Sequence, residues 1–188
     1  MDLNELRATA ATCQLCNLYR GRINPVFDKG NPESSILICG MVPAAEENQS
    51  GLPFVGRAGQ LLDVILDKVD LTLEDVYVTN LVKCFLAAGE PLNDDWVSQC
   101  LPYVITQISL IRPKIIITLG KDASTALLDE KKNVSLKSLQ GRLFDYADGI
   151  KIMPTYHPSY LLRTGGERSA VYKDVLKHFS VAKEIATS

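Results

Sequence analysis

The 188-residue chain lacks the features that mark several common classes of protein. It has no run of about 18 apolar residues, which a membrane-spanning helix needs, and its first residues lack the basic and apolar zones of a signal peptide. It has no excess of basic residues, because its formal net charge is -2. It also lacks the phosphate-binding patterns G-x-x-x-x-G-K-[ST] and G-x-G-x-x-G. These absences predict a soluble, cytoplasmic protein and argue against a domain that binds nucleic acid mainly through phosphate contacts.

Cysteine is more frequent than histidine, with five cysteines against two histidines. In a reducing compartment, cysteines do not indicate a disulfide framework. Cys13 and Cys16 form a C-x2-C pair, and Cys84 and Cys100 lie far downstream. Four thiolates can hold zinc or an iron–sulfur cluster, and the spacing alone leaves both, and chance occurrence, open. Cys39 ends an apolar run and is interpreted as a small buried hydrophobe.

The hydrophobic pattern predicts one domain over residues 1–188, because 46% of the residues are hydrophobic and the chain is long enough to bury one core. Short apolar runs predict buried strands, and apolar stripes with helical spacing predict helices between them. Alternating strands and helices favour a three-layer α/β/α sandwich around a central four-stranded parallel sheet. The predicted strands are 35–39, 76–79, 114–119 and 149–153, and the predicted helices are 58–69, 94–111, 121–129 and 168–186.

Several polar or small residues follow the predicted strands. Gly40, Asn80, Gly120 and His157 each lie at or just past a strand end. Ligands of parallel α/β sheets bind beyond the carboxyl ends of the strands. The backbone of His157 precedes Pro158, which favours an extended conformation and a ring presented from a loop.

A series of short motifs occurs in a fixed order along the chain: C-x2-C, N-P-x-S-x-I, G-x-x-P-x-x-E-E, G-x-P-F-V-G-R-A-G, V-Y-x-T-N-x-V-K-C, C-x-P-Y, I-R-P-K-I-I-I-x-L-G and M-P-T-Y-H-P-S-Y-L-L-R. In this order the chain resembles the family 4 uracil-DNA glycosylases from Cys13 to about Phe179. The resemblance implies a four-stranded parallel sheet between helices and a monomer that removes uracil from single- or double-stranded DNA. It also implies a structural [4Fe-4S] cluster on Cys13, Cys16, Cys84 and Cys100.

The resemblance implies roles for residues of a base pocket, because such an enzyme must extrude the nucleotide before it can act. Phe54 would stack on the flipped uracil, and Gly40 and Met41 would line the pocket. The Asn80 amide would read the uracil edge and reject cytosine, which inverts donor and acceptor. His157 would donate a hydrogen bond to uracil O2 as negative charge develops on the departing base.

The same resemblance implies a DNA-binding segment after His157. Leu161 would be an exposed wedge that fills the space left by the flipped nucleotide, and Arg163 would lie near phosphate. Ser159 would either cap the following turn or contact phosphate.

The chain departs from the family pattern at two places. Met41 and Val42 replace the polar residues that usually position water or offset positive charge on the sugar, and Met offers neither group. Glu46, Glu47 and Asn48 are candidates to compensate, and we assign catalytic roles to Glu47 and Asn48 on this basis. After Cys84, the arginine-containing family string is replaced by residues 85–90, which carry no basic side chain and should weaken DNA affinity.

Two function classes follow from these observations. The first is a glycosylase that hydrolyses the N-glycosidic bond of uracil, with reduced or altered activity. The second is a catalytically inactive module of the same fold that binds DNA, a base or a protein. Apolar residues at Met41 and Val42 favour the module, whereas intact Phe54, Asn80 and His157 favour the enzyme. An unrelated zinc or nucleotide-binding domain is a remote third reading.

Overall fold

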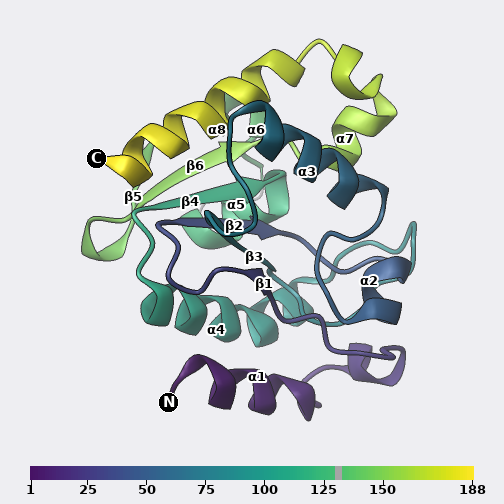
Figure 1. Ribbon diagram of the computed structural model, residues 1–188. Coiled ribbons are helices and arrows are strands. Elements are labelled where there is room, and N and C mark those ends of the chain that lie inside the picture. The colour runs from purple at the N-terminus through teal and green to yellow at the C-terminus, as the bar shows by residue number, and fades with distance from the viewer. Residues whose placement is uncertain (130–132) are drawn as a thin grey trace.

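The computed structural model describes residues 1–129 and 133–188, and in these residues one mixed sheet has the strand order β1-β3-β2-β4-β6-β5 (Figure 1). Its four central strands are parallel, as predicted: β3 (Val76–Asn80), β2 (Ile36–Gly40), β4 (Ile115–Leu119) and β6 (Lys151–Thr155). At the edges, β1 (Lys29–Gly30) and β5 (Phe144–Asp145) pair antiparallel with β3 and β6. These two edge strands were not predicted, because two residues are too few to show a hydrophobic period.

The predicted helices correspond to α3 (Arg57–Lys68), α4 (Asp94–Ile111), α5 (Lys121–Leu128) and α8 (Tyr172–Thr187). The last begins later than predicted because residues 166–168 form a separate 3-10 turn. Sequence patterns did not predict the shorter or more polar helices α1 (Leu3–Ala11), α2 (Ala45–Ser50), α6 (Leu136–Leu139) and α7 (Pro158–Arg163), nor the 3-10 turns Asn17–Arg20 and Ala147–Gly149.

Helix α7 corrects the prediction that His157 is presented from an extended loop. Pro158 occupies the first helical position, where its missing N–H and fixed φ are tolerated. His157 keeps the extended backbone expected before proline, with φ -70° and ψ 139°, and forms the N-cap of the helix. A six-residue helix is too short to be recognised by periodicity.

The sheet is covered on both faces, so the three-layer sandwich is confirmed. Alternate residues of β2 point to opposite faces: Leu37 and Cys39 enter one core and Ile36 and Ile38 the other. Helices α4 and α5 pack in the first core, with α1 against α4, and helices α3, α7 and α8 pack in the second (Figure 1). No helix among the described residues is long and apolar enough to cross a membrane.

The parallel register brings the functional segments to one edge of the sheet. Gly40 pairs with Asn80 at the ends of β2 and β3, and Leu119 pairs with Thr155 at the ends of β4 and β6. The segments that follow all four strands therefore lie at the same carboxyl edge, where a ligand site is expected.

Candidate active site

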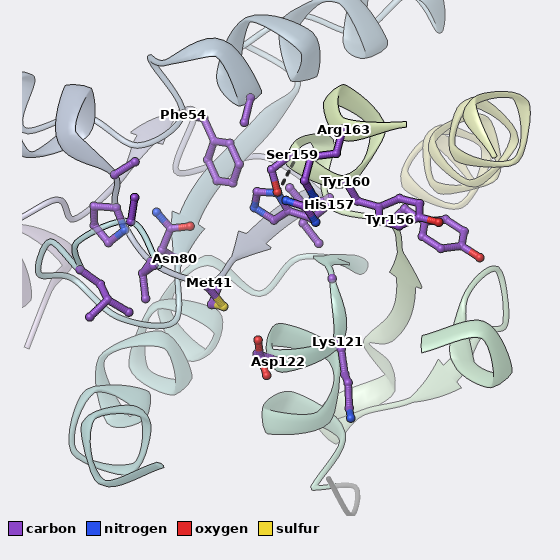
Figure 2. Close-up of a pocket in the computed structure, with 18 of the residues that line it drawn as sticks. Met41, Phe54, Asn80, Lys121, Asp122, Tyr156, His157, Ser159, Tyr160 and Arg163 are labelled. Atoms are coloured by element: carbon purple, nitrogen blue, oxygen red, sulfur yellow. Dashed lines mark hydrogen bonds between the residues drawn. The ribbon is translucent and has the colours of Figure 1, made fainter. Parts of the chain in front are cut away.

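A cleft of about 790 Å³ opens at the carboxyl edge of the parallel strands. Figure 2 shows Phe54, Asn80 and His157 pointing toward a common space in this cleft. The volume lies within the range of about 300–1,000 Å³ that is typical of small-molecule sites. The fold thus brings together three side chains that the sequence separates by many residues.

Gly40 supports this group from behind, because a side chain there would collide with both neighbours. A Cβ atom on Gly40 would lie 2.4 Å from Asn80 Oδ1 and 2.5 Å from the Phe54 ring. Only glycine therefore allows the amide and the ring to lie this close to the end of β2. Contrary to the prediction, Gly40 therefore does not line the cleft itself but lies behind the Asn80 and Phe54 side chains that do.

Asn80 is almost completely buried, with 2% of its surface exposed. Its Oδ1 atom has no hydrogen-bond partner among the described residues. Buried polar atoms are nearly always paired, and an unpaired one calls for an explanation such as a bound ligand. The amide of Asn80 is thus held at the cleft with an acceptor that is not used by the protein.

Phe54 has a strained backbone, because its φ of 54° lies in the left-handed region that non-glycine residues rarely adopt. The Lys29 ammonium donates to the Phe54 carbonyl oxygen at 2.8 Å. The centroid of the Phe54 ring lies 5.8 Å from that of the His157 ring, with 32° between the planes. Strain of this kind persists where the surroundings hold it, and it concentrates at functional sites.

Glu47 braces the strained segment rather than presenting a free carboxylate. Its Oε1 accepts hydrogen bonds from the N–H groups of Val55 and Gly56, both at 2.8 Å, and its Oε2 accepts from the Ala44 N–H at 3.1 Å. The residue is 6% exposed and lines the cleft. Both of its carboxylate oxygens therefore bind main-chain N–H groups, one from the residue before α2 and two from the residues before α3.

Asn48 does not lie where a catalytic group is expected, which corrects its assignment. Its Oδ1 accepts from the Ile23 N–H at 2.7 Å, and its carbonyl oxygen accepts from the Asn24 amide at 3.0 Å. The side chain thus faces the segment after the first 3-10 turn and does not line the cleft. Glu46, the remaining candidate, is exposed and lies outside the cleft lining.

Replacing Glu47 with alanine should destabilise the protein by about 1–3 kcal/mol, because the partly buried N–H of Val55 and the buried N–H of Gly56 would lose their acceptor. Urea unfolding measures this change as a lower midpoint. The matched control is Glu46→Ala, which removes the neighbouring exposed carboxylate and should stay within about 0.5 kcal/mol of wild type. Equal stability of the two variants would show that Glu47 does not brace the segment.

His157 has its two ring nitrogens in different environments. Nδ1 accepts a hydrogen bond from the Ser159 N–H at 3.1 Å and lies 2.8 Å from the Ser159 hydroxyl oxygen. Burial, with a smaller effect of the Arg163 charge, lowers the pKa of His157 to about 4. The ring is therefore neutral near pH 7. Because Nδ1 accepts, the proton resides on Nε2, which is left as a donor for a group in the cleft.

Leu161 is fully buried, which corrects the prediction of an exposed wedge. Its exposed fraction is 0%, and it packs in the core beneath α7. The helix turns this residue inward, so the exposed large hydrophobic side chain of α7 is Tyr160, at 39%. Tyr160 stacks on Tyr156 with centroids 5.3 Å apart and 20° between planes, and the Arg163 guanidinium lies 6.0 Å from the Tyr160 ring.

The remaining lining residues show what the sequence patterns located and what they missed. Met41 and Val42 are partly exposed and line the cleft, so an apolar thioether occupies the wall below Asn80 (Figure 2). Lys121 and Asp122 lie on the opposite wall and were not predicted, although their place directly after a strand end could have indicated them. Ser159 and Arg163 also line the cleft.

The four cysteines of the C-x2-C pair and the downstream positions line one small second pocket: Cys13, Cys16, Cys84 and Cys100. Two N–H groups donate to their sulfur atoms, from the Lys83 main chain to Cys100 at 3.3 Å and from Arg22 to Cys84 at 3.4 Å. Among the described residues, no three His, Cys, Asp or Glu side chains are grouped to hold a single metal ion. The soft donor set with N–H···S bonds fits an iron–sulfur cluster, whose properties depend on such hydrogen bonds.

Cys39 lies apart from this set and is fully buried, as predicted. Burial raises the pKa of its thiol to about 12. The side chain therefore stays protonated and packs as a small hydrophobe.

Comparison with known proteins gives consistent matches over most of the chain. Residues 27–180 match the family model described as uracil DNA glycosylase superfamily. A type-4 uracil-DNA glycosylase of Thermotoga maritima is 37% identical over 92% of this chain and 90% of its own length. A type-4 uracil-DNA glycosylase of Saccharolobus solfataricus is 38% identical over 88% of this chain and 79% of its own. A type-5 uracil-DNA glycosylase of Pyrobaculum aerophilum is 26% identical over 85% and 76%.

Proposed function

The chain belongs to the type-4 uracil-DNA glycosylases of the uracil-DNA glycosylase superfamily, and from this membership we propose that it excises uracil from DNA in base-excision repair. The reaction is hydrolysis of the N-glycosidic bond between uracil and deoxyribose. The substrate is uracil-containing DNA, with one nucleotide extruded into the cleft. Monomeric state and cytoplasmic location stay predictions from the sequence.

The observation that carries this proposal is the unpaired Oδ1 of Asn80. Uracil offers a donor at N3–H and an acceptor at O4, and a side-chain amide complements both. Cytosine has an acceptor at N3, so the same amide would place acceptor against acceptor. A site that leaves a buried polar group unpaired with the wrong ligand discriminates strongly against that ligand.

His157 supplies the chemistry at the opposite edge of the base. As the glycosidic bond breaks, the bonding electrons move to the uracil ring and negative charge grows on its oxygens. The Nε2–H of neutral His157 donates to O2 and stabilises this charge, which increases only as the bond breaks. Phe54 stacks on the ring and holds it between the two hydrogen-bonding side chains.

The two positions at which the family usually carries a polar group for the attacking water are Met41 and Val42 in this chain. Met41 and Val42 are apolar, and Glu47 is held by three main-chain N–H groups. We therefore propose slow but measurable excision. The alternative of an inactive binding module is not favoured, because a module would not need a stacking ring, an unpaired amide and a donor imidazole around one space.

The test is incubation of the pure protein with labelled oligonucleotides that contain one uracil, as single strand and as duplex, followed by alkali to cleave abasic sites. Matched oligonucleotides with cytosine or thymine at the same position are the controls. Cleavage only of the uracil strands is expected. Binding of the uracil strands without cleavage at high protein concentration would instead establish the inactive module.

We further propose that Cys13, Cys16, Cys84 and Cys100 hold a [4Fe-4S] cluster. The cluster would act as a crosslink, because its ligands come from the segment after α1, the segment after β3, and helix α4. The support is the shared pocket and the N–H···S hydrogen bonds.

Anaerobically purified protein should therefore be brown and contain about four irons per chain, as expected of one Cys-ligated cluster. Cys100→Ser should lose iron and melt at a lower temperature, since metal binding contributes directly to folding in sites of this kind. Iron content and thermal unfolding measure both effects, with Cys39→Ser as a cysteine variant that should retain iron. Stoichiometric zinc without iron would contradict the assignment.

A further inference from the structure

Lys83 is a buried cation that the proposed chemistry does not use. Its side chain lies in the interior, with 2% of the residue exposed. The ammonium donates to three neutral acceptors: Thr79 Oγ1 at 2.6 Å, the Asn80 carbonyl oxygen at 2.7 Å and Gln107 Oε1 at 2.7 Å. One of these acceptors thus belongs to the residue whose amide faces the base.

No carboxylate among the described residues forms a salt bridge with this ammonium. Asp28 acts on it only from a distance, because its oxygens accept from Arg7 Nη2 at 2.7 Å and from the Tyr77 hydroxyl at 2.6 Å. The ammonium is therefore held by hydrogen bonds to uncharged groups. A buried ammonium without a charged partner loses its hydration and gains no ion pair in return.

The cysteine pocket, which Lys83 lines, is a source of compensating charge. The Lys83 main chain donates to Cys100 Sγ at 3.3 Å, and Cys84 is the next residue. Cysteine ligands of a cluster are thiolates, and the assembly of cluster and thiolates carries net negative charge. Cys100 and Gln107 also share helix α4, two turns apart, and therefore lie on the same face of that helix.

Lys83 thus lies between two sites. Its main-chain N–H donates to Cys100 Sγ on one side, and its ammonium donates to the Asn80 carbonyl oxygen on the other. Among the residues that the structure describes, none forms a hydrogen bond with the amide oxygen of Asn80, so the direction of the side chain depends on how firmly its main chain is fixed.

We propose that Lys83 is a positioning residue that couples the cysteine pocket to uracil recognition: the negative cluster balances its charge, and its ammonium fixes Asn80 in the position that reads the base. This inference rests on the proposed function and the proposed cluster. It predicts that a change of charge at Lys83 alters both uracil excision, through Asn80, and the midpoint potential of the cluster. A purely structural lysine would affect stability alone.

The first test is a double-mutant cycle between Lys83→Met, which keeps the length of the side chain without its charge, and Asn80→Ala. Lys83→Met should lower kcat/KM for a uracil oligonucleotide about tenfold, a coupling typical of residues in one hydrogen-bond network. In the Asn80→Ala background the same substitution should change kcat/KM little. Additive effects of the two substitutions would overturn the positioning role.

The second test is the midpoint potential of the cluster in the iron-loaded protein. Removing a nearby positive charge stabilises the oxidised cluster, so Lys83→Met should shift the potential to a more negative value, and Lys83→Arg should keep it near wild type. The matched control is Lys29→Met, which removes another largely buried ammonium that binds a pocket carbonyl but does not line the cysteine pocket. An unchanged potential in fully loaded Lys83→Met would overturn the charge balance.

These measurements distinguish a failure of the proposed function from a failure of the charge balance and from a failure of the positioning role. Wild-type protein that excises no uracil would refute the proposed function, while the potential would still decide the role of the Lys83 charge. Protein without iron would overturn the charge balance, while the mutant cycle would still decide the positioning of Asn80. If Lys83→Met does not fold, Lys83→Arg serves in the cycle, because a planar guanidinium cannot reproduce one point charge among three acceptors.

Discussion

Replacing His157 with alanine should lower kcat for uracil excision by about two to three orders of magnitude, the usual effect of removing one donor to a developing oxyanion. Affinity for the uracil oligonucleotide should change much less, because the contact strengthens only as charge grows on the base. Single-turnover excision and equilibrium binding, measured on the same oligonucleotide, separate the two quantities. A matched control is His178→Ala, because the ring of His178 bonds to Thr155 outside the cleft lining.

The pH dependence of the same enzyme follows from the low pKa of His157. The functional form is the neutral ring, which is lost only as the pH falls through about 4. Excision should therefore show no step from His157 between about pH 5 and 8, unlike a histidine with its ordinary pKa near 6.5. A step near pH 6.5 that disappears in His157→Ala would show that the ring is protonated more easily than its burial implies.

Stability should also depend on this residue at acidic pH. The native ring resists protonation down to a pKa of about 4, whereas the unfolded ring takes a proton near its ordinary value of 6.5. Above that value neither state binds the proton and His157 adds no pH dependence. Below it, only the unfolded ring binds a proton, and this binding stabilises the unfolded state. The free energy of unfolding therefore falls as the pH drops from about 6.5 toward 4.

The strands of the sheet could be predicted because each central strand is a continuous apolar run, and β4 and β2 are buried throughout. Short, continuous apolar runs of this kind are typical of strands that are buried on both faces of a parallel sheet. The carboxyl-edge location of Asn80 and His157 followed from this, since parallel strands end together. Short elements gave no comparable signal, and α7 shows the consequence: a six-residue helix turned Leu161 into the core and Tyr160 outward.

The roles of polar residues were harder to predict, because they depend on partners distant in sequence. Glu47 is a candidate base in the sequence, but main-chain N–H groups eight and nine residues away occupy its carboxylate. Lys83 gives no sign of burial in the string V-K-C, since lysine is usually exposed. Its acceptor Gln107 lies 24 residues downstream on another element. Only the folded chain shows that this lysine, and not a carboxylate, binds the main chain of Asn80.

Met41→Glu should raise uracil excision by about one to two orders of magnitude, equivalent to about 1.4–2.7 kcal/mol of barrier. Met41 lines the cleft wall below Asn80 (Figure 2), and we expect a carboxylate there to reach water and the sugar of an extruded nucleotide. There it would orient the attacking water and offset positive charge on the sugar. Because the position is partly exposed, the new carboxylate keeps contact with solvent and need not be buried without a partner.

The matched control is Met41→Gln, which has the same length and polarity without the charge. A gain with Glu but not with Gln would identify the missing charge as the cause of slow excision. Thermal unfolding of both variants must first show that they fold as the wild type does. A folded Met41→Glu protein without any gain, together with an inactive wild type, would leave the binding module as the function. Rapid excision by the wild type would instead mean that another group, or the DNA itself, activates the water, since Met41 has no atom that can accept its proton.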